Sequence, residues 1–235
     1  MRQARPDGGT RRHRTSHSLD AVLTEAVALL DEGGEEALTF RALAARLGGG
    51  VASIYWYVAS RDELLDRATD HAVEGVLATV RAIPTTDDPI DDIRRIAVAL
   101  FDGVVDRPWL AAYFLRNTSV QPTSLAIYEH LGEQTMRLDL TPLQRFHAVS
   151  AITGYVIGTA TDLGQEPPEA VVQGSVTREA FLADAAEQWR ELDPAEFPFV
   201  HHIVDEFATH VDADQFLAGL DLLLAGLRLQ ATAAR

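Results

Sequence analysis

The sequence predicts an all-α protein in which a compact three-helix module precedes a larger helical body. Apolar residues recur three or four positions apart in almost every segment, which is the spacing of one helix face. No segment alternates β-branched and polar residues, and no Asn-Gly pair indicates a hairpin. Glycines, prolines and helix-capping residues separate the periodic segments, so each helix can be delimited in turn.

The first two helices have recognisable ends. We expect a helix over 18–32, because Ser18 can cap its N-terminus and Gly33-Gly34 can end it. A second, short helix is expected over 39–47, where Thr39 is the N-cap. A glycine-containing turn between two short helices is typical of a helix-turn-helix, whose second helix enters the DNA major groove.

A third helix is expected over 51–58, directly after the three glycines at 48–50. Val51, Ile54 and Val58 would form its inward stripe. The same helix would then present small and aromatic side chains on its other side. The sequence offers no reason for having three glycines at the turn.

Three aromatic residues in a row distinguish this third helix. A helix turns by about 100° per residue, so Tyr55, Trp56 and Tyr57 cannot all face one core. Outward rings can contact thymine methyls or the sugar-phosphate backbone, and Ala52 and Ser53 are small enough to let the backbone approach base edges. An ordinary corner of two packed helices is the alternative explanation, although it accounts less well for large rings on a polar face.

The fourth helix is expected to be long, over 60–82. Ser60 as N-cap and Glu63 three residues later form a capping-box pattern. The next break ends at Asp88-Pro89, an N-cap followed by proline at the first helical position. Seven further helices are expected over 89–106, 108–117, 121–139, 141–163, 177–192, 194–210 and 212–230. Residues 164–176 are expected to form a mobile loop.

Charge and composition exclude several classes of protein. The formal net charge of −15 argues against a protein coated in nucleic acid, but not against a local basic contact surface. Residues 1–18 hold five arginines against Asp7, a formal charge of +4. Absent cysteines exclude disulfide and thiolate chemistry, and neither a membrane span nor a secretory signal is evident. We therefore expect a cytoplasmic protein that does not contact membranes.

The segment LTFRALAARLGGGVASIYWYVASRDELLD resembles the signature of the tetracycline-repressor (TetR) family of bacterial transcription regulators. The resemblance spans about 19–66. It implies an all-α homodimer with an N-terminal helix-turn-helix DNA-binding domain and a larger C-terminal domain for effector binding and dimerisation. The implied divisions are a basic flexible arm at 1–17, the DNA-binding domain at 18–66 and the effector domain at 67–235.

Positions carried over from the family give a set of DNA-contact candidates. Thr39 and Arg61 would anchor phosphates, and the third helix would lie in the groove. The full set is Thr39, Arg41, Ala52, Ser53, Tyr55, Trp56, Tyr57 and Arg61. Three glycines replace the usual single one, and Arg61 and Tyr57 stand where members often have lysine and histidine, so the operator sequence is not transferable.

The basic tail is a further DNA-contact candidate. We hypothesise that Arg11, Arg12 and Arg14 reach the DNA backbone or the minor groove, as basic arms do. A disordered, solubilising tail is the equally weighted alternative.

Beyond residue 90 the resemblance is weaker, but it implies a dimer interface and a pocket. Apolar and small residues in 141–163 and 212–230 would pair with their copies, as a pseudo-palindromic double-stranded operator requires two recognition helices. Side chains that could line an effector pocket are mostly aromatic: Phe101, Trp109, Tyr113, Phe114, Tyr128, Phe146, Thr153 and Trp189. A plain helical core is the alternative for each of them.

Two other site types are considered and set aside. His202, Glu206 and His210 fall at i, i+4 and i+8, a spacing that could hold a divalent metal, but a solvated helix face is the more ordinary explanation. No metal or other cofactor is expected beyond a small-molecule effector. Hydrolase, phosphate-loop and dinucleotide motifs are absent, so an enzyme is a poorer alternative than a helical protein–protein interaction module.

Overall fold

The computed structural model describes residues 17–116, 121–164 and 169–233, and all regular structure in these ranges is helical. The all-α prediction is therefore confirmed. The chain divides into two compact units between His71 and Ala72, and each unit is described by itself. No helix in the described ranges combines the length and the apolar character that crossing a membrane requires.

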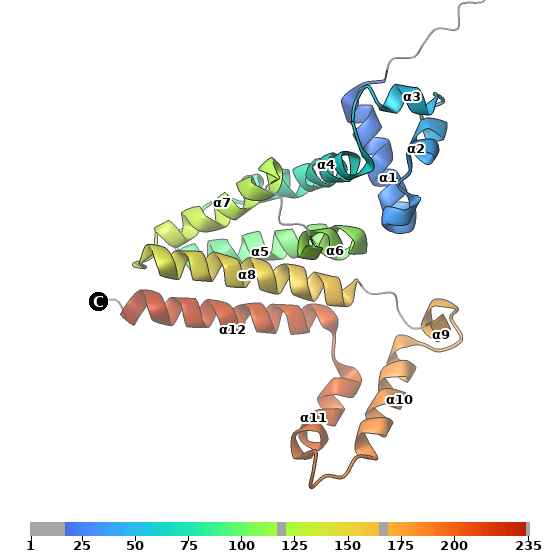
Figure 1. Cartoon of the computed structure of the whole chain (residues 1–235). Helices are drawn as coiled ribbons and strands as arrows, with labels where there is room; N and C mark the ends of the chain where they lie inside the picture. The colour runs from blue at the N-terminus through green and yellow to red at the C-terminus, as the bar shows by residue number, and fades with distance from the viewer. Residues whose placement is uncertain (1–16, 117–120, 165–168, 234–235) are drawn as a thin grey trace, which may run out of the picture. The chain divides into compact units, whose positions relative to one another are not determined.

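The first unit contains three helices and the first half of a fourth (Figure 1). Their bounds are α1 (Leu19–Ala37), α2 (Phe40–Arg46), α3 (Val51–Ile54) and α4 (Arg61–Ala82). Ser18 and Thr39 cap α1 and α2 as the sequence predicts, each accepting a bond from the backbone N–H three residues on, at 3.0 and 3.1 Å.

Two boundaries differ from expectation. Gly33 and Gly34 do not end α1 but kink it, since both leave helical geometry and the helix resumes as far as Ala37. Helix α3 is a single turn that ends at Ile54 rather than at 58, and a non-helical turn follows over 55–57.

The three-glycine turn begins with a Schellman motif that ends α2. The N–H of Gly48 donates to the carbonyl of Ala45 at 3.1 Å, and that of Gly49 donates to Ala44 at 2.9 Å. Gly48 has φ +65°, whereas Gly50 is in extended geometry as the N-cap of α3. The left-handed conformation therefore explains one of the three glycines.

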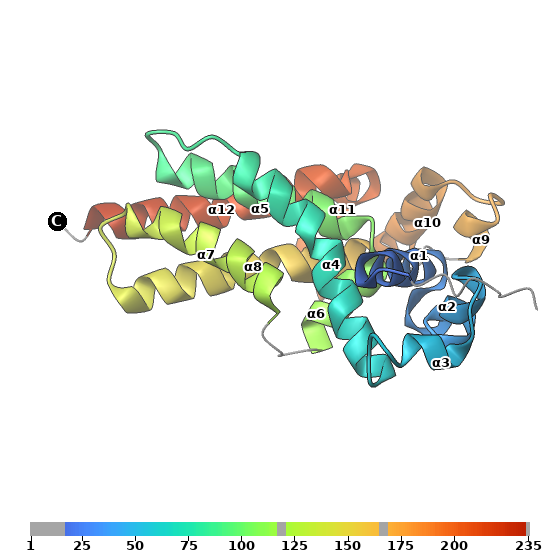
Figure 2. The ribbon, with the colours of Figure 1, turned by 90° about the horizontal axis from the view of Figure 1, so that it is seen from above.

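The second unit is a helical body in which α5 is central. Its bounds and those of the helices after it are α5 (Pro89–Val105), α6 (Pro108–Arg116), α7 (Pro122–Met136), α8 (Pro142–Leu163), α9 (Glu169–Val172), α10 (Arg178–Arg190), α11 (Pro198–Thr209) and α12 (Asp212–Ala233). Helix α5 packs against α6, α7, α8 and α12 (Figures 1 and 2). Proline begins five of these helices, at the position where its missing N–H costs nothing. The expected loop at 164–176 contains the short helix α9.

A stack of rings joins three of these helices. Phe101 of α5 stacks on Phe216 of α12 with ring centroids 3.7 Å apart. Tyr155 of α8 also stacks on Phe216, with centroids 5.7 Å apart. The Tyr155 hydroxyl donates to the Phe216 carbonyl at 3.0 Å. A Cβ on Gly219 would lie 2.0 Å from that hydroxyl oxygen, so the close approach of α8 to α12 requires glycine at this position.

Helices α10 and α11 form a hairpin that packs chiefly on itself (Figure 1). The indole of Trp189 stacks on Phe207 with centroids 3.9 Å apart, and Arg190 pairs with Asp205 at 2.5 Å. These contacts assign Trp189 to the hairpin core.

A buried carboxylate fastens the start of α5. Asp92 is 2% exposed and accepts bonds from the Thr86 backbone and hydroxyl, from Arg95, and from Arg137 at 2.5 Å. Burial alone would raise the pKa of Asp92, but the bonds from Arg137 and Thr86 outweigh it and hold that pKa below its ordinary value. The α4–α5 connection, α5 and the end of α7 are thus tied to one ionised group.

Candidate DNA-contact surface and ligand pocket

The most exposed large ring of the first unit lies directly after α3. The side chain of Trp56 is 85% exposed and that of Tyr55 is 59% exposed, while Ile54 and Val58 are buried on either side of them. Tyr55 keeps one contact with its module, an edge-to-face packing on Phe40 with centroids 4.9 Å apart. Burial of the flanking aliphatic residues leaves the two rings on the outer surface.

Two neighbours differ from the predicted arrangement. Val51 was expected in the inward stripe but is 37% exposed, because α3 ends at Ile54 and the helical register does not continue to Val58. Tyr57 was expected on the outer face, but its side chain is half-buried and its hydroxyl donates to the backbone carbonyl of His17.

The other α2–α3 candidates lie at helix starts. Thr39 uses its hydroxyl to cap α2, and Arg41 is exposed in the first turn of the same helix. Ala52 is exposed, and the Ser53 hydroxyl donates to the Gly50 carbonyl at 2.6 Å. Ala52 and Ser53 thus lie in α3, a few residues before the exposed rings of Tyr55 and Trp56 in the sequence.

Arg61, a predicted phosphate anchor, has partners within its own unit. Its Nε donates to the Leu38 carbonyl at 2.9 Å, and its guanidinium also donates to the carbonyl of Glu35. Both carbonyls belong to the end of α1 and the connection to α2, so Arg61 fastens the start of α4 to that segment. The capping box predicted at the start of α4 forms in part. Ser60 Oγ accepts from the Glu63 N–H at 3.0 Å, but the Glu63 carboxylate accepts from the backbone N–H of Ala59, one residue before the N-cap, at 2.7 Å.

Arg11, Arg12 and Arg14 lie outside the described residues. The chain enters the described structure at His17, whose carbonyl is held by Tyr57.

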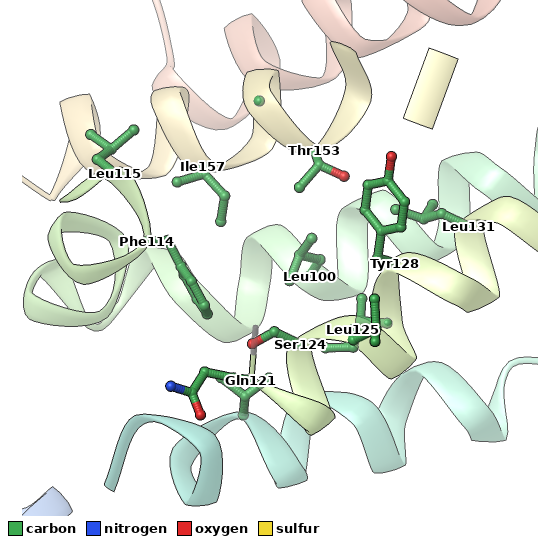
Figure 3. A pocket seen from close by; sticks show the side chains of 13 residues that line it. Leu100, Phe114, Leu115, Gln121, Ser124, Leu125, Tyr128, Leu131, Thr153 and Ile157 are labelled. Carbon is green, nitrogen blue, oxygen red and sulfur yellow. The ribbon is translucent and has the colours of Figure 1, made fainter. Parts of the chain in front are cut away.

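The second unit contains a mostly apolar cavity of about 430 Å³ that is open to solvent on one side (Figure 3). Its walls come from α4, α5, α6, α7 and α8 and from the residue that precedes α7. The lining residues are Val73, Leu100, Phe114, Leu115, Gln121, Ser124, Leu125, Ile127, Tyr128, Leu131, Thr153, Gly154 and Ile157. In the view of Figure 3, Phe114 and Tyr128 lie on opposite sides of it.

The structure brings together three of the eight predicted ligand residues. Phe114, Tyr128 and Thr153 line the cavity. The other five lie elsewhere: Phe101 in the ring stack, Trp109 and Tyr113 buried in α6, Phe146 exposed on α8, and Trp189 in the hairpin. Sequence reasoning favoured aromatic residues and so missed the aliphatic and hydroxyl side chains of α7, whose shared helix face was the available signal.

The helix face that was considered and set aside as a metal site, with His202, Glu206 and His210, does not form as a continuous face. Helix α11 ends at Thr209, and His210 is in extended geometry, so the i, i+4, i+8 register is broken before its third member. The His210 ring instead contacts the Phe207 carbonyl at 2.7 Å and Asp212 at 3.2 Å. Within the part of the chain that the structure describes, no group of three His, Cys, Asp or Glu side chains is arranged to hold a metal ion.

Two family models match separate parts of the chain. Residues 22–68 match the model described as bacterial regulatory proteins of the tetR family. Residues 83–231, more than half of the chain, match the tetracyclin repressor-like C-terminal domain.

Curated relatives are transcriptional regulators. A helix-turn-helix regulator of Saccharopolyspora erythraea is 31% identical over 142 residues, which are 60% of this chain and 59% of that protein's length. The repressor DrrR1 of Streptomyces coeruleorubidus is 28% identical over 232 residues, a match that covers 90% of this chain and 77% of the length of DrrR1.

Two solved structures with the same fold come from Streptomyces coelicolor. The TetR regulator SCO7222 is 34% identical with a TM-score of 0.76, over 92% of this chain and 99% of that chain. ActR in complex with actinorhodin shares the fold at 21% identity, with a TM-score of 0.80 over 94% of this chain and all of that one. These matches, together with the helix-turn-helix, show that the chain belongs to the TetR family of bacterial regulatory proteins.

Proposed function

We propose that the protein represses transcription as a homodimer on a pseudo-palindromic DNA operator, and that a small-molecule effector bound in the α4–α8 cavity releases it. The observation that carries the DNA-binding part is the surface at α3, where Trp56 and Tyr55 are exposed while their aliphatic neighbours are buried. Neighbouring large rings exposed to this degree are typical of an interaction surface and offer contact area to a nucleic acid.

Trp56 and Tyr55 are proposed to contact bases or sugars beside Ala52 and Ser53. Thr39 and Arg41 are proposed to contact phosphate at the start of α2. Tyr57 and Arg61 have internal partners, and we propose that they contribute chiefly by holding the α3 segment and the start of α4 in place.

The dimer is proposed to form through α8 and α12, which lie side by side (Figure 1). Helix α12 exposes an apolar stripe at i, i+4, i+7 and i+11: Ala218, Leu222, Ala225 and Leu229. On α8, Leu143 and Phe146 are 63% and 59% exposed. An apolar face of this kind on paired helices supports a helix-bundle interface between two copies.

The effector is proposed to occupy the cavity of the second unit. Its volume and apolar walls suit a small molecule, and ActR, which shares the fold, has been solved with actinorhodin. Helix α4 supplies the coupling route that we propose, because one continuous helix begins with Arg61 of the first unit and carries Val73 of the cavity wall. An effector shifts the population toward the released state by its differential affinity, and the coupling is reciprocal.

The basic arm is proposed to add DNA contacts in the cytoplasm, where the operator lies. Its support is the Tyr57–His17 bond, which holds the base of the arm to the segment that bears Trp56. Deletion of residues 1–15 should then weaken operator binding and reduce its dependence on salt concentration. Unchanged affinity and salt slope would argue against the arm.

Selection of genomic fragments tests the proposed function as a whole. The full chain is incubated with sheared DNA of its own genome, and the retained fragments are sequenced. We expect enrichment of a few intergenic fragments that share a pseudo-palindrome, including DNA beside the protein's own gene. Retention of fragments without a shared sequence, or of none, would contradict the proposal.

A further inference from the structure

Two hydroxyl groups that line the cavity lack hydrogen-bond partners. The oxygens Ser124 Oγ and Thr153 Oγ1 are buried and unpartnered within the described part of the chain. Buried polar groups in folded proteins are almost always bonded, and leaving one unsatisfied is destabilising. Ser124 and Thr153 both line one cavity, so rotation of either side chain would bring an unpartnered hydroxyl to a molecule bound there.

The other polar side chains of the cavity each have a hydrogen-bond partner within the chain. The Gln121 amide donates to the Tyr113 hydroxyl at 3.1 Å, and the Tyr128 hydroxyl lies 3.3 Å from Ser150 Oγ. Among the described lining residues, the hydroxyl groups with no partner are thus those of Ser124 on α7 and Thr153 on α8. Figure 3 shows these two side chains entering the cavity from different helices.

The lining of the cavity also disfavours a buried charge on the ligand. None of the described lining residues is charged. Apart from the polar side chains of Gln121, Ser124 and Thr153 and from Gly154, the wall consists of aliphatic and aromatic side chains. A charge placed there would lose its hydration without gaining a counter-charge. The lining therefore favours an occupant that is neutral, apolar over most of its surface, and polar at a small number of points.

We propose that Ser124 and Thr153 determine effector specificity by hydrogen-bonding to hydroxyl or carbonyl groups of an uncharged, mainly apolar effector. The inference rests on the proposed function in that it takes the cavity to be the effector site. A hydroxyl both donates and accepts, so either polar group on the ligand satisfies it.

Matched ligand pairs test the role of the two hydroxyls directly. The probes are naphthalene and 2,6-dihydroxynaphthalene, stilbene and 4,4′-dihydroxystilbene, and anthraquinone and 2,6-dihydroxyanthraquinone. Dissociation constants are measured on the full chain by thermal-shift titration without DNA. We expect the hydroxylated member of at least one pair to bind about tenfold more tightly, the effect of roughly two net hydrogen bonds.

The double variant Ser124→Ala/Thr153→Val should reduce that preference to within about twofold, leaving the affinity of the unhydroxylated member unchanged. Its melting temperature without ligand should be equal to or above that of the wild type, because the removed hydroxyls have no partner to lose. Thr69→Val is the matched control, since the Thr69 hydroxyl is also buried and unpartnered but lies outside the cavity. It should keep the full preference.

An unaltered preference in the double variant, or no binding of any pair, would overturn the inference. Because these titrations contain no DNA, their outcome is separate from the fragment selection. Specific DNA retention together with an unaltered ligand preference would leave the regulator intact and remove the two hydroxyls from its specificity. Loss of the preference in the double variant, without specific DNA retention by the wild type, would support the role of the two hydroxyls in ligand binding and contradict the proposed regulator.

Discussion

Gly48, Gly49 and Gly50 differ in their need for glycine, although the sequence gives them the same appearance. Gly48 has φ +65°, Gly49 would place a Cβ 3.1 Å from Ser53 Oγ, and Gly50 has extended geometry with open space around a Cβ. Caps such as Thr39 depend on the next few residues and could be predicted from sequence. The Tyr57–His17 bond joins residues far apart in the chain, so local pattern gave no sign of it.

Gly48→Ala should lower the free energy of unfolding by about 1–2 kcal/mol, the cost of a left-handed conformation for a residue with a Cβ. Urea denaturation followed by circular dichroism measures this. Gly50→Ala is the matched control and should lower stability by less than Gly48→Ala does, because Gly50 has extended geometry and open space around a Cβ, so that only its weak capping role is lost. Equal effects of the two would show that the Schellman turn does not require glycine.

Gly219→Ala should be destabilising by about 1–3 kcal/mol, because the new methyl group would overlap the Tyr155 ring in a packed region. Thermal unfolding of the full chain provides the measurement. Gly132→Ala, inside α7 with open space around a Cβ, should be neutral or stabilising by up to about 1 kcal/mol. A Gly219→Ala variant as stable as the wild type would mean that α8 and α12 separate easily.

Helix positions were predictable because apolar periodicity and caps are local, whereas their exact ends depended on packing. The kink in α1 and the shortness of α3 arise where glycines and the turn geometry prevail over the apolar pattern. The cavity residues of α7 were missed for a related reason, since which face of a helix lines a void is decided by neighbouring helices. Asp92 likewise looks in the sequence like any other acidic residue at the start of α5. Its role depends on tertiary contacts with Thr86 and Arg137, which local pattern does not reveal.

Asp92→Asn should reduce the free energy of unfolding at pH 7 by about 3 kcal/mol, since two arginines lose a buried counter-charge. The folded pKa of Asp92 lies below its ordinary value of about 3.9. Its contribution is therefore present above that pH and lost as pH falls through the folded pKa. Stability below pH 4 should fall less steeply in the variant than in the wild type.

Chemical denaturation from pH 7 to pH 2 measures both effects. Asp91→Asn is the control, because Asp91 makes an exposed i,i+4 pair with Arg95 that is worth less than about 1 kcal/mol. Parallel pH profiles for the wild type and Asp92→Asn would contradict the assigned role.

At the scale of the whole molecule, dimerisation should depend on the exposed face of α12. Leu222 is 76% exposed in the single chain, so Leu222→Glu should leave the fold intact while placing charge in the proposed interface. Sedimentation analysis should show dimers for the wild type and monomers for the variant. Met136→Glu, at a similarly exposed apolar site on α7, should remain dimeric. A dimeric Leu222→Glu variant would place the interface elsewhere.

The fold class and the helix-turn-helix were visible in the sequence because local signals carry them, while the inner partners of Tyr57 and Arg61 were not. Fluorescence anisotropy on the selected operator tests the central claim most directly, with Trp56→Ala compared with Phe199→Ala, which truncates an exposed ring on α11. We predict that Trp56→Ala weakens operator binding at least about tenfold, an effect within the range of lost groove contacts, and that Phe199→Ala binds like the wild type. Operator affinity unchanged by Trp56→Ala would contradict the account.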